Sequence, residues 1–229
     1  MISLVIPVYN EERILPDTIA ALSGFCTREG VGELIFSDDG SSDGSAALLD
    51  EARRRDGRIR LLRNPHRGKG GAVRAGVLAS RGETVLFTDC DLAYGADQMA
   101  GLLRAHREGG ADITVATRTL GEESYGGYSA LRRWGSEAMR RLIRLRTGLR
   151  VRDIQAGLKC FNGEAARTLF ARCRCDGFAF DTEVLLLAQR EGRVIGEFPV
   201  KMPPQAEQRE SRVRPVRDAL KMLWEIGRM

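Results

Sequence analysis

The chain has 229 residues, of which 43% are hydrophobic, 29% charged and 6% aromatic. This composition is typical of a globular protein and excludes disordered, collagen-like and coiled-coil chains. A single large domain of this length buries enough surface to fold without a disulfide or a structural metal. No apolar run approaches the roughly 18 residues of a membrane span, and residues 1–3 lack the basic segment of a secretory signal. We therefore expect a soluble, cytoplasmic protein.

Cysteine, histidine and arginine usage narrows the possible chemistry. The five cysteines form no C-x-x-C pair, so we expect idle thiols, and the two histidines exclude a multi-histidine metal centre. The formal net charge is +5, and eight arginines fall within residues 132–152. A basic segment of this kind can contact nucleic acid, an anionic membrane surface or a phosphorylated substrate, and composition does not choose among them.

In the first half of the chain, short apolar runs alternate with amphipathic segments. The runs predict strands at residues 3–8, 33–37, 58–63, 83–88 and 112–117. The intervening segments predict helices from residue 11, capped by Asn10, and at 43–54, 69–80 and 96–108. Strands that alternate with helices of this length indicate crossover units, so we expect an α/β fold with a mainly parallel sheet flanked by helices.

The pattern loosens in the second half. A Gly-rich loop is expected at residues 121–127, and a helix at 129–146 with one apolar stripe formed by Leu131, Trp134, Ala138, Leu142 and Leu145. Further elements follow in chain order: a strand at 157–161, helices at 163–171 and 181–190, a strand at 194–200, a polar stretch at 201–214 and an amphipathic helix at 215–226.

Acidic clusters follow two of the predicted strands, at residues 38–43 (DDGSSD) and 89–91 (DCD). Ligands of open α/β sheets bind at the carboxyl ends of strands. Asp89 and Asp91, two residues apart at such an end, can turn both carboxylates toward one ligand. Oxygen ligands of this kind suit Mg²⁺ or Mn²⁺ held by one or two carboxylates together with a substrate diphosphate.

Two glycine-rich segments imitate other motifs. Residues 40–44 match the G-x-S-x-G nucleophile elbow, but that motif needs a later histidine and none follows His106. Residues 68–71 (GKGG) lack the spacing of a phosphate-binding P-loop, and Val73 replaces the last glycine of the dinucleotide pattern. The serine hydrolase, P-loop kinase and dehydrogenase interpretations therefore lose their support.

Taken together, the segments at residues 6–12 (IPVYNEE), 38–43, 67–72 (RGKGGA) and 89–91 resemble the family 2 glycosyltransferases of the GT-A fold. Residues 153–159 (DIQAGLK), 178–183 (FAFDTE) and 211–213 (SRV) resemble the polyprenyl-phosphate sugar synthases within it, especially the dolichyl-phosphate β-glucosyltransferases. The resemblance implies one GT-A domain over residues 1–229. Its parts would be a nucleotide-sugar half at 1–118, an acceptor half at 119–200, and a tail with an amphipathic helix at 201–229.

The resemblance also implies roles for individual residues. The nucleotide sugar would be bound by Pro7, Tyr9, Glu11, Asp38, Asp39, Lys69, Asp89 and Asp153. The catalytic group would comprise Asp91 as metal ligand with Asp181, Arg118, Gln155 and Lys159, and the acceptor phosphate would meet Arg132 and Arg133. Ala93 stands where part of the family has a glutamine, which leaves a third protein ligand of the metal in doubt.

Structural alternatives stay open for several of these residues: Tyr9 as a packed ring, Lys69 and Arg118 as surface cations, Asp181 as a helix N-cap, and Gln155 and Lys159 as structural groups.

The function implied by the resemblance is inverting transfer of a hexose from a nucleotide-diphosphate sugar, with UDP-glucose favoured, to a polyprenyl phosphate. Mg²⁺ or Mn²⁺ would be the cofactor, and the protein would lie peripherally on the cytoplasmic membrane face. The main alternative is transfer to a hydroxyl of a soluble glycan or small metabolite, which needs Asp181 or Glu183 as base. Nucleic acid is disfavoured as a partner because no recognition motif accompanies the arginines. A sugar nucleotidyltransferase is disfavoured because residues 6–12 contain no glycine.

Overall fold

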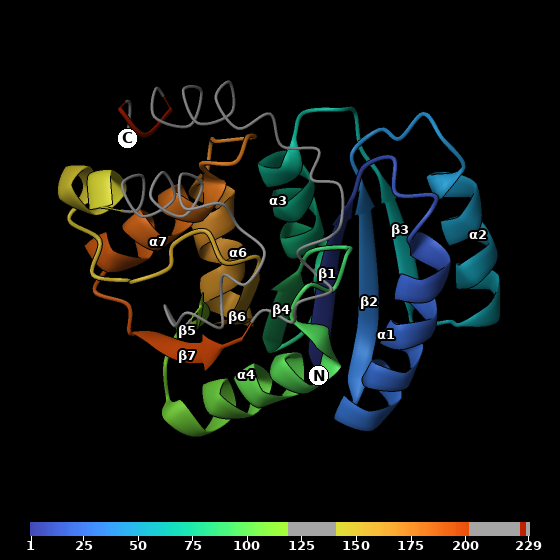
Figure 1. Ribbon diagram of the computed structural model, residues 1–229, viewed down its shortest axis with the longest axis horizontal. Coiled ribbons are helices and arrows are strands. Elements are labelled where there is room, and N and C mark those ends of the chain that lie inside the picture. Colours follow the sequence, from blue (N-terminus) through green and yellow to red (C-terminus); the bar gives the residue numbers. More distant parts are fainter. Residues whose placement is uncertain (119–140, 202–224, 228–229) are drawn as a thin grey trace.

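A twisted sheet of seven strands forms the centre of the molecule (Figure 1). The computed structural model describes residues 1–118, 141–201 and 225–227. In chain order the strands are β1 (Ile2–Val8), β2 (Val31–Asp38), β3 (Ile59–Arg63), β4 (Thr84–Thr88), β5 (Ile113–Arg118), β6 (Leu158–Asn162) and β7 (Ile195–Val200). Their order across the sheet is β3-β2-β1-β4-β6-β5-β7. Only β6 runs antiparallel to its neighbours, so the predicted mainly parallel sheet is confirmed.

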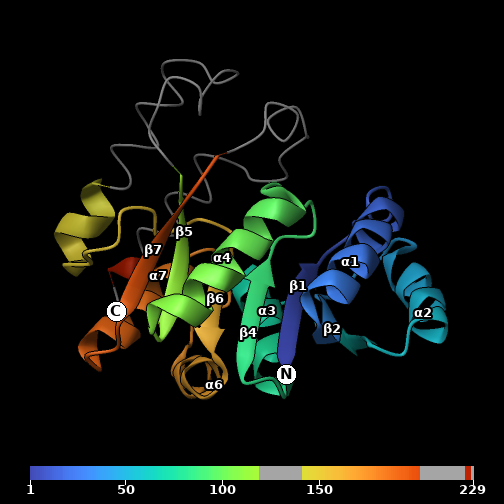
Figure 2. The ribbon, with the colours of Figure 1, turned by 90° about the horizontal axis from the view of Figure 1, so that it is seen from below.

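Helices cover both faces of the sheet (Figure 2). They are α1 (Leu15–Glu29), α2 (Ser45–Arg55), α3 (Lys69–Ala79), α4 (Gly95–Gly109), α6 (Gly163–Arg172) and α7 (Phe180–Arg190). The first buried cluster joins α1, α2 and α4 to one face of the sheet, and the second joins α3, α6 and α7 to the other. In β1, Leu4 and Ile6 belong to the first cluster and Val5 to the second. A strand buried on both faces is apolar throughout, which explains the continuous runs in the sequence.

The predicted N-cap at Asn10 is wrong. Helix α1 begins at Leu15, with Ile14 as its N-cap and a proline in its first turn. Asn10 has a φ of 54°, in the left-handed region that asparagine tolerates better than most residues. Its side-chain oxygen accepts the backbone N–H of Ser42 at 2.7 Å. Asn10 therefore links the loop after β1 to the loop after β2.

Within the described residues, the predicted apolar stripe of the arginine-rich helix is exposed and is not the side that packs on the protein. Residues 141–147 are helical, but Ile143 is the buried member, 1% exposed, while Leu142 is 43% and Leu145 85% exposed. Ile143 packs in the second buried cluster with Leu149 and Val151. Contact with this cluster fixes which side of the helix faces inward, and spacing alone could not supply that information.

Several expectations lie outside the described residues. They are the loop at 121–127, the helix at 129–146 as far as residue 140, Arg132 and Arg133, the segment 211–213, and most of the helix at 215–226. Within residues 1–118, 141–201 and 225–227, no helix combines the length and the apolar character needed to cross a bilayer.

Candidate active site

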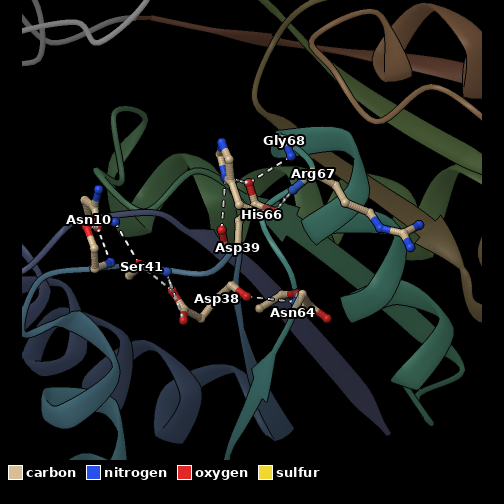
Figure 3. A network of polar contacts seen from close by, with 10 residues as sticks. Asn10, Asp38, Asp39, Ser41, Asn64, His66, Arg67 and Gly68 are labelled. Atoms are coloured by element: carbon tan, nitrogen blue, oxygen red, sulfur yellow. Dashed lines mark hydrogen bonds and ion pairs between the residues drawn. The ribbon is translucent and has the colours of Figure 1, made fainter.

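The loop after β2 is built around Asp38. The Asp38 carboxylate is buried and accepts the backbone N–H of Ser41 at 3.2 Å and the hydroxyl of the same residue. The Ser41 hydroxyl oxygen in turn accepts the backbone N–H of Asn10 at 2.8 Å (Figure 3). The carboxyl ends of β1 and β2 are thus joined by side chains, and Asp38 is held rigidly between them.

Asp39 fixes the loop between β3 and α3. Its buried carboxylate accepts the backbone N–H groups of Arg67 and Gly68, both at 2.9 Å. It also lies 2.8 Å from Nδ1 of His66 (Figure 3). The Asp39 carboxylate thus holds residues 66–68 at the edge of the sheet beside Asp38.

A stacked pair of rings lies at this edge. The rings of Tyr9 and His66 have centroids 4.3 Å apart and an interplanar angle of 18°. Both are accessible, with Tyr9 39% exposed and the His66 side chain 56% exposed. An exposed flat ring is a surface on which a nucleobase can stack. His66 belongs to no motif in the sequence, and its only local signal is its place directly before the Arg67-Gly68 segment.

Lys69 and Asp89 form an ion pair where α3 begins and β4 ends. Lys69, the first residue of α3, places its Nζ 2.6 Å from Oδ1 of Asp89, the residue that follows β4. Burial disfavours the charged ammonium, but the carboxylates of Asp89, Asp181 and Asp91 outweigh it and raise the pKa of Lys69 above its usual value. Lys69 is therefore a permanent positive charge at neutral pH.

Asp91 is the residue best suited to hold a metal. It is half-buried, and its Oδ1 accepts the backbone N–H of Ala93 at 3.1 Å, which orients the carboxylate. No group of three or more His, Cys, Asp or Glu able to hold a metal occurs among the described residues. Mg²⁺ is commonly bound by one or two carboxylates and by substrate phosphates instead of a complete protein cage. Asp91, with Asp89 nearby, fits a metal that is shared with a bound diphosphate.

Arg118 is held by Asp153 in a two-pronged ion pair. Nε and Nη2 of Arg118 lie 2.6 and 2.8 Å from the two carboxylate oxygens of Asp153. Asp153 is buried, and the Arg118 side chain is 31% exposed. Gln155 follows on the same loop and is half-buried. Burial raises the pKa of Tyr94, which the charges of Arg118 and Asp153 also influence. In this conformation the Asp153 carboxylate orients Arg118.

Asp181 and Lys159 form a second ion pair, deeper in the molecule. Lys159 is 0% exposed, and its Nζ donates to Oδ1 of Asp181 at 2.5 Å and to the carbonyl of Ala156 at 2.6 Å. Burial raises the pKa of Asp181, and the Lys159 ammonium opposes that shift. The N-cap of α7 is Ala179, so the alternative role of Asp181 as a helix N-cap is wrong.

Glu183 is engaged with the backbone. Its carboxylate accepts the N–H groups of Arg174 at 3.0 Å and Cys175 at 2.7 Å. This fixes the segment before α7 and leaves the Glu183 side chain directed at a loop.

The structure gathers many of the sequence-predicted residues at the carboxyl edge of the sheet. Pro7, Tyr9 and Glu11 follow or end β1, Asp38 and Asp39 end β2, Asp89 and Asp91 follow β4, and Lys69 begins α3. Arg118 ends β5, and its ion pair with Asp153 places that carboxylate at the same edge. Lys159 and Asp181 lie behind this edge in the protein interior.

A sheet covered on both faces, with acidic residues and a lysine at the carboxyl ends of its strands, defines an α/β protein of the kind that binds ligands at that edge. Comparison with known families makes the assignment specific. The family model for glycosyl transferase family 2 matches residues 3–170, and the chain belongs to that family.

Relatives are found in all three domains of life. The chain is 32% identical to the glycosyltransferase AglD of Haloferax volcanii, over 99% of this chain and 36% of the relative. It is 32% identical to a dolichyl-phosphate beta-glucosyltransferase of Trichomonas vaginalis, over 87% of this chain and 63% of the relative. It is 31% identical to the undecaprenyl-phosphate 4-deoxy-4-formamido-L-arabinose transferase of Pseudomonas aeruginosa, over 86% of this chain and 59% of the relative. The chain thus spans less than two thirds of the length of each.

Solved structures confirm the GT-A fold. Glucosyl-3-phosphoglycerate synthase of Mycobacterium tuberculosis, crystallised with Mn²⁺, UDP and phosphoglyceric acid, superposes with a TM-score of 0.71 at 20% identity, over 99% of this chain and 76% of that one. Mannosyl-3-phosphoglycerate synthase of Rubrobacter xylanophilus gives a TM-score of 0.70 at 18% identity, over 100% of this chain and 75% of that one.

Proposed function

We propose that the chain transfers a hexose, with inversion, from a nucleotide-diphosphate sugar to a polyprenyl phosphate, with Mg²⁺ or Mn²⁺ as cofactor. The observation that carries the proposal is the grouping of Asp38, Lys69, Asp89 and Asp91 at one edge of the sheet. Family membership supports sugar transfer, and relatives named for dolichyl and undecaprenyl phosphate support the acceptor class.

The donor would lie across the ends of β1, β2 and β4. Its base would stack at the exposed rings of Tyr9 and His66 and approach the Asp38 carboxylate, with Pro7 and Glu11 lining the same end. Its diphosphate would then reach the rim where Lys69 and Asp91 lie. UDP-glucose is the favoured donor, because relatives are named as glucosyltransferases and a neighbour of the same fold was crystallised with UDP-glucose.

The metal would be held at Asp91, with Asp89 beside it. When bound there, a divalent ion would supply charge neutralisation for the leaving diphosphate, an effect worth several kcal/mol. On the protein side, the Lys69 ammonium and the Arg118 guanidinium add fixed positive charge near the same group. Each is oriented by a carboxylate, Asp89 and Asp153 respectively.

The described residues favour a phosphate acceptor over a hydroxyl acceptor. A hydroxyl needs a carboxylate base, and Asp181 and Glu183 were the candidates. Asp181 is paired with Lys159, and Glu183 accepts two backbone N–H groups. A phosphate monoester has a second pKa of about 6 and attacks as a dianion at neutral pH without a base. Arg132 and Arg133, outside the described residues, remain the predicted contacts of the acceptor phosphate.

Peripheral contact with a membrane would bring this acceptor to the site. Leu142 and Leu145 project from the helical residues 141–147 with 43% and 85% exposure. Arg141 and Arg146 are exposed on the same short helix. Exposed leucines flanked by arginines are suited to the interface of an anionic bilayer.

A panel of nucleotide sugars, each assayed with a polyprenyl phosphate and with hydroxyl acceptors including 3-phosphoglycerate, tests the proposal. We expect UDP-glucose with the lipid phosphate to give the highest turnover. Glucose transfer to 3-phosphoglycerate with none to the lipid would instead support the soluble-acceptor alternative.

A further inference from the structure

A lysine ammonium lies in the interior behind the donor edge. Lys159 is in the antiparallel strand β6 and has no exposed surface. Its Nζ contacts Asp181 at 2.5 Å and the Ala156 carbonyl at 2.6 Å. Burying an ion pair costs several kcal/mol per ion in desolvation, and well-packed apolar residues often stabilise a protein at least as well. Stability alone therefore does not account for this pair.

The Asp181 end of the pair interacts electrostatically with Lys69, across the contact between α3 and α7. Gly70, which follows Lys69, packs so closely on α7 that a Cβ there would come within 2.7 Å of Cβ of Phe180. The Phe180 ring makes an edge contact with Phe87 at 5.9 Å, and Lys69 Nζ lies 5.8 Å above the Phe87 ring. The first turns of α3 and α7 are thus in contact, and the charges of Lys69 and Asp181 influence each other across it.

Charges of opposite sign therefore alternate from the rim into the interior, in the order Asp89, Lys69, Asp181, Lys159. Lys69 contacts Asp89 directly at 2.6 Å, and Asp181 is held on the far side by Lys159. Two carboxylates therefore act on the Lys69 ammonium: Asp89 contacts it directly at the rim, and Asp181 acts on it electrostatically from the interior.

We propose that Asp181 is a positioning residue that keeps the Lys69 ammonium directed at the donor diphosphate, and that Lys159 is the fixed counter-charge that holds Asp181 in place. The inference rests on the proposed function, because it takes Lys69 to meet the diphosphate. It assigns Asp181 and Lys159 a role through Lys69, where the family resemblance implied direct participation. Asp181 supplies a carboxylate that stays with Lys69 when Asp89 turns to a ligand.

The experiment compares binding of UDP with binding of uridine, both in the presence of Mg²⁺, by calorimetry. Lys69→Met sets the loss expected when the ammonium is absent. Asp181→Asn should lower UDP affinity about tenfold, a loss of about 1.4 kcal/mol, and leave uridine affinity unchanged. Because Asp181→Asn leaves Lys159 uncompensated and can impair folding, the double variant Lys159→Met/Asp181→Asn removes both charges together. Arg74→Met/Asp176→Asn, a 2.5 Å pair that also joins α3 to the segment before α7, is the matched control.

We expect the double variant to unfold at a temperature near that of the wild type and still to bind UDP about tenfold more weakly. Added to Lys69→Met, Asp181→Asn should cause no further loss. A folded double variant that binds UDP like the wild type would overturn the inference alone, because the pair would then serve only packing. Failure of the wild type to bind UDP or any other nucleoside diphosphate would overturn the proposed function, and the inference with it.

Discussion

Gly157 lies directly against the carboxylate of Asp89, and a Cβ at Gly157 would come within 2.0 Å of Asp89 Oδ2. The Asp89 backbone N–H also donates to the Gly157 carbonyl at 3.2 Å. The other oxygen of the same carboxylate faces Lys69. Glycine at position 157 thus determines where Asp89 can point.

Gly157→Ala should therefore displace the Asp89 carboxylate and lower kcat/KM by about 100-fold, the scale expected for a misplacement of about 1 Å in an active site. Gly24→Ala is the matched control, because nothing lies within 4 Å of a Cβ at that position of α1. The control should keep full activity and gain roughly 0.5–1 kcal/mol of stability, since alanine favours a helix over glycine. If Gly157→Ala has the kcat/KM of the wild type, the observed position of the Asp89 carboxylate is not required for activity.

Asp38→Asn should weaken UDP and uridine binding to a similar extent, by about tenfold or more, because a carboxylate that accepts a base N–H is replaced by an amide. Calorimetry measures both affinities. Ser41→Ala is the control: it removes the hydroxyl that Asp38 accepts but keeps the carboxylate. Equal uridine affinity in wild type and Asp38→Asn would reject a base-binding role for Asp38.

The sequence predicted the strands and the carboxyl edge well, because a strand buried on both faces must be apolar and polar loops must follow it. Glu33 to Ser37, for example, lies within the observed β2 (Val31–Asp38). The hydrogen-bond partner of a single side chain is harder to predict, because it can come from a segment distant in the sequence. Asn10 has the residue type of an N-cap, yet its side chain binds the loop after β2.

Other features depend on contacts between residues distant in the chain. The stack of Tyr9 on His66, the close approach of Gly157 to Asp89 and the pairing of Lys159 with Asp181 join separate elements. No local pattern encodes them, because each arises only when the sheet assembles. The sequence likewise does not show which side of residues 141–147 faces the protein, because packing of Ile143 in the second buried cluster decides it.

Metal binding should depend on Asp91 and on a nucleoside diphosphate together, because a single carboxylate is a weak site for a divalent ion. Electron paramagnetic resonance of Mn²⁺ should show the ion bound with UDP present and largely free without it. Asp91→Ala should abolish the bound signal, whereas Asp97→Ala, at a fully exposed carboxylate on α4, should leave it unchanged. Retained Mn²⁺ binding in Asp91→Ala would place the metal elsewhere.

Membrane binding should require the exposed face of residues 141–147. Leu142→Ser/Leu145→Ser should weaken flotation with anionic vesicles, because it removes the apolar side chains that would enter the interface. Arg141→Glu should separately weaken it, because each nearby cation contributes about 1 kcal/mol, roughly fivefold in binding. High salt should weaken the wild type by screening the arginines. Reversal of both Arg140 and Arg141 should have a larger effect, although Arg140 lies outside the described residues.

Val194→Ser is the control, because it also replaces an exposed apolar side chain, 58% exposed, with serine but lies outside this helix. Flotation of the leucine variant and of Arg141→Glu at wild-type levels would contradict membrane docking through this helix and would favour a soluble acceptor.

The most direct test of the central claim is transfer of labelled glucose from UDP-glucose to polyprenyl phosphate, followed by organic extraction of the lipid product. With Mg²⁺ or Mn²⁺, the wild type should yield a labelled lipid, whereas chelator or Asp91→Ala should abolish it. Excess metal should restore the chelated wild type and leave the variant inactive. Undiminished transfer in chelator, or a wild type that labels no lipid with any nucleotide sugar while labelling a soluble acceptor, would contradict the account.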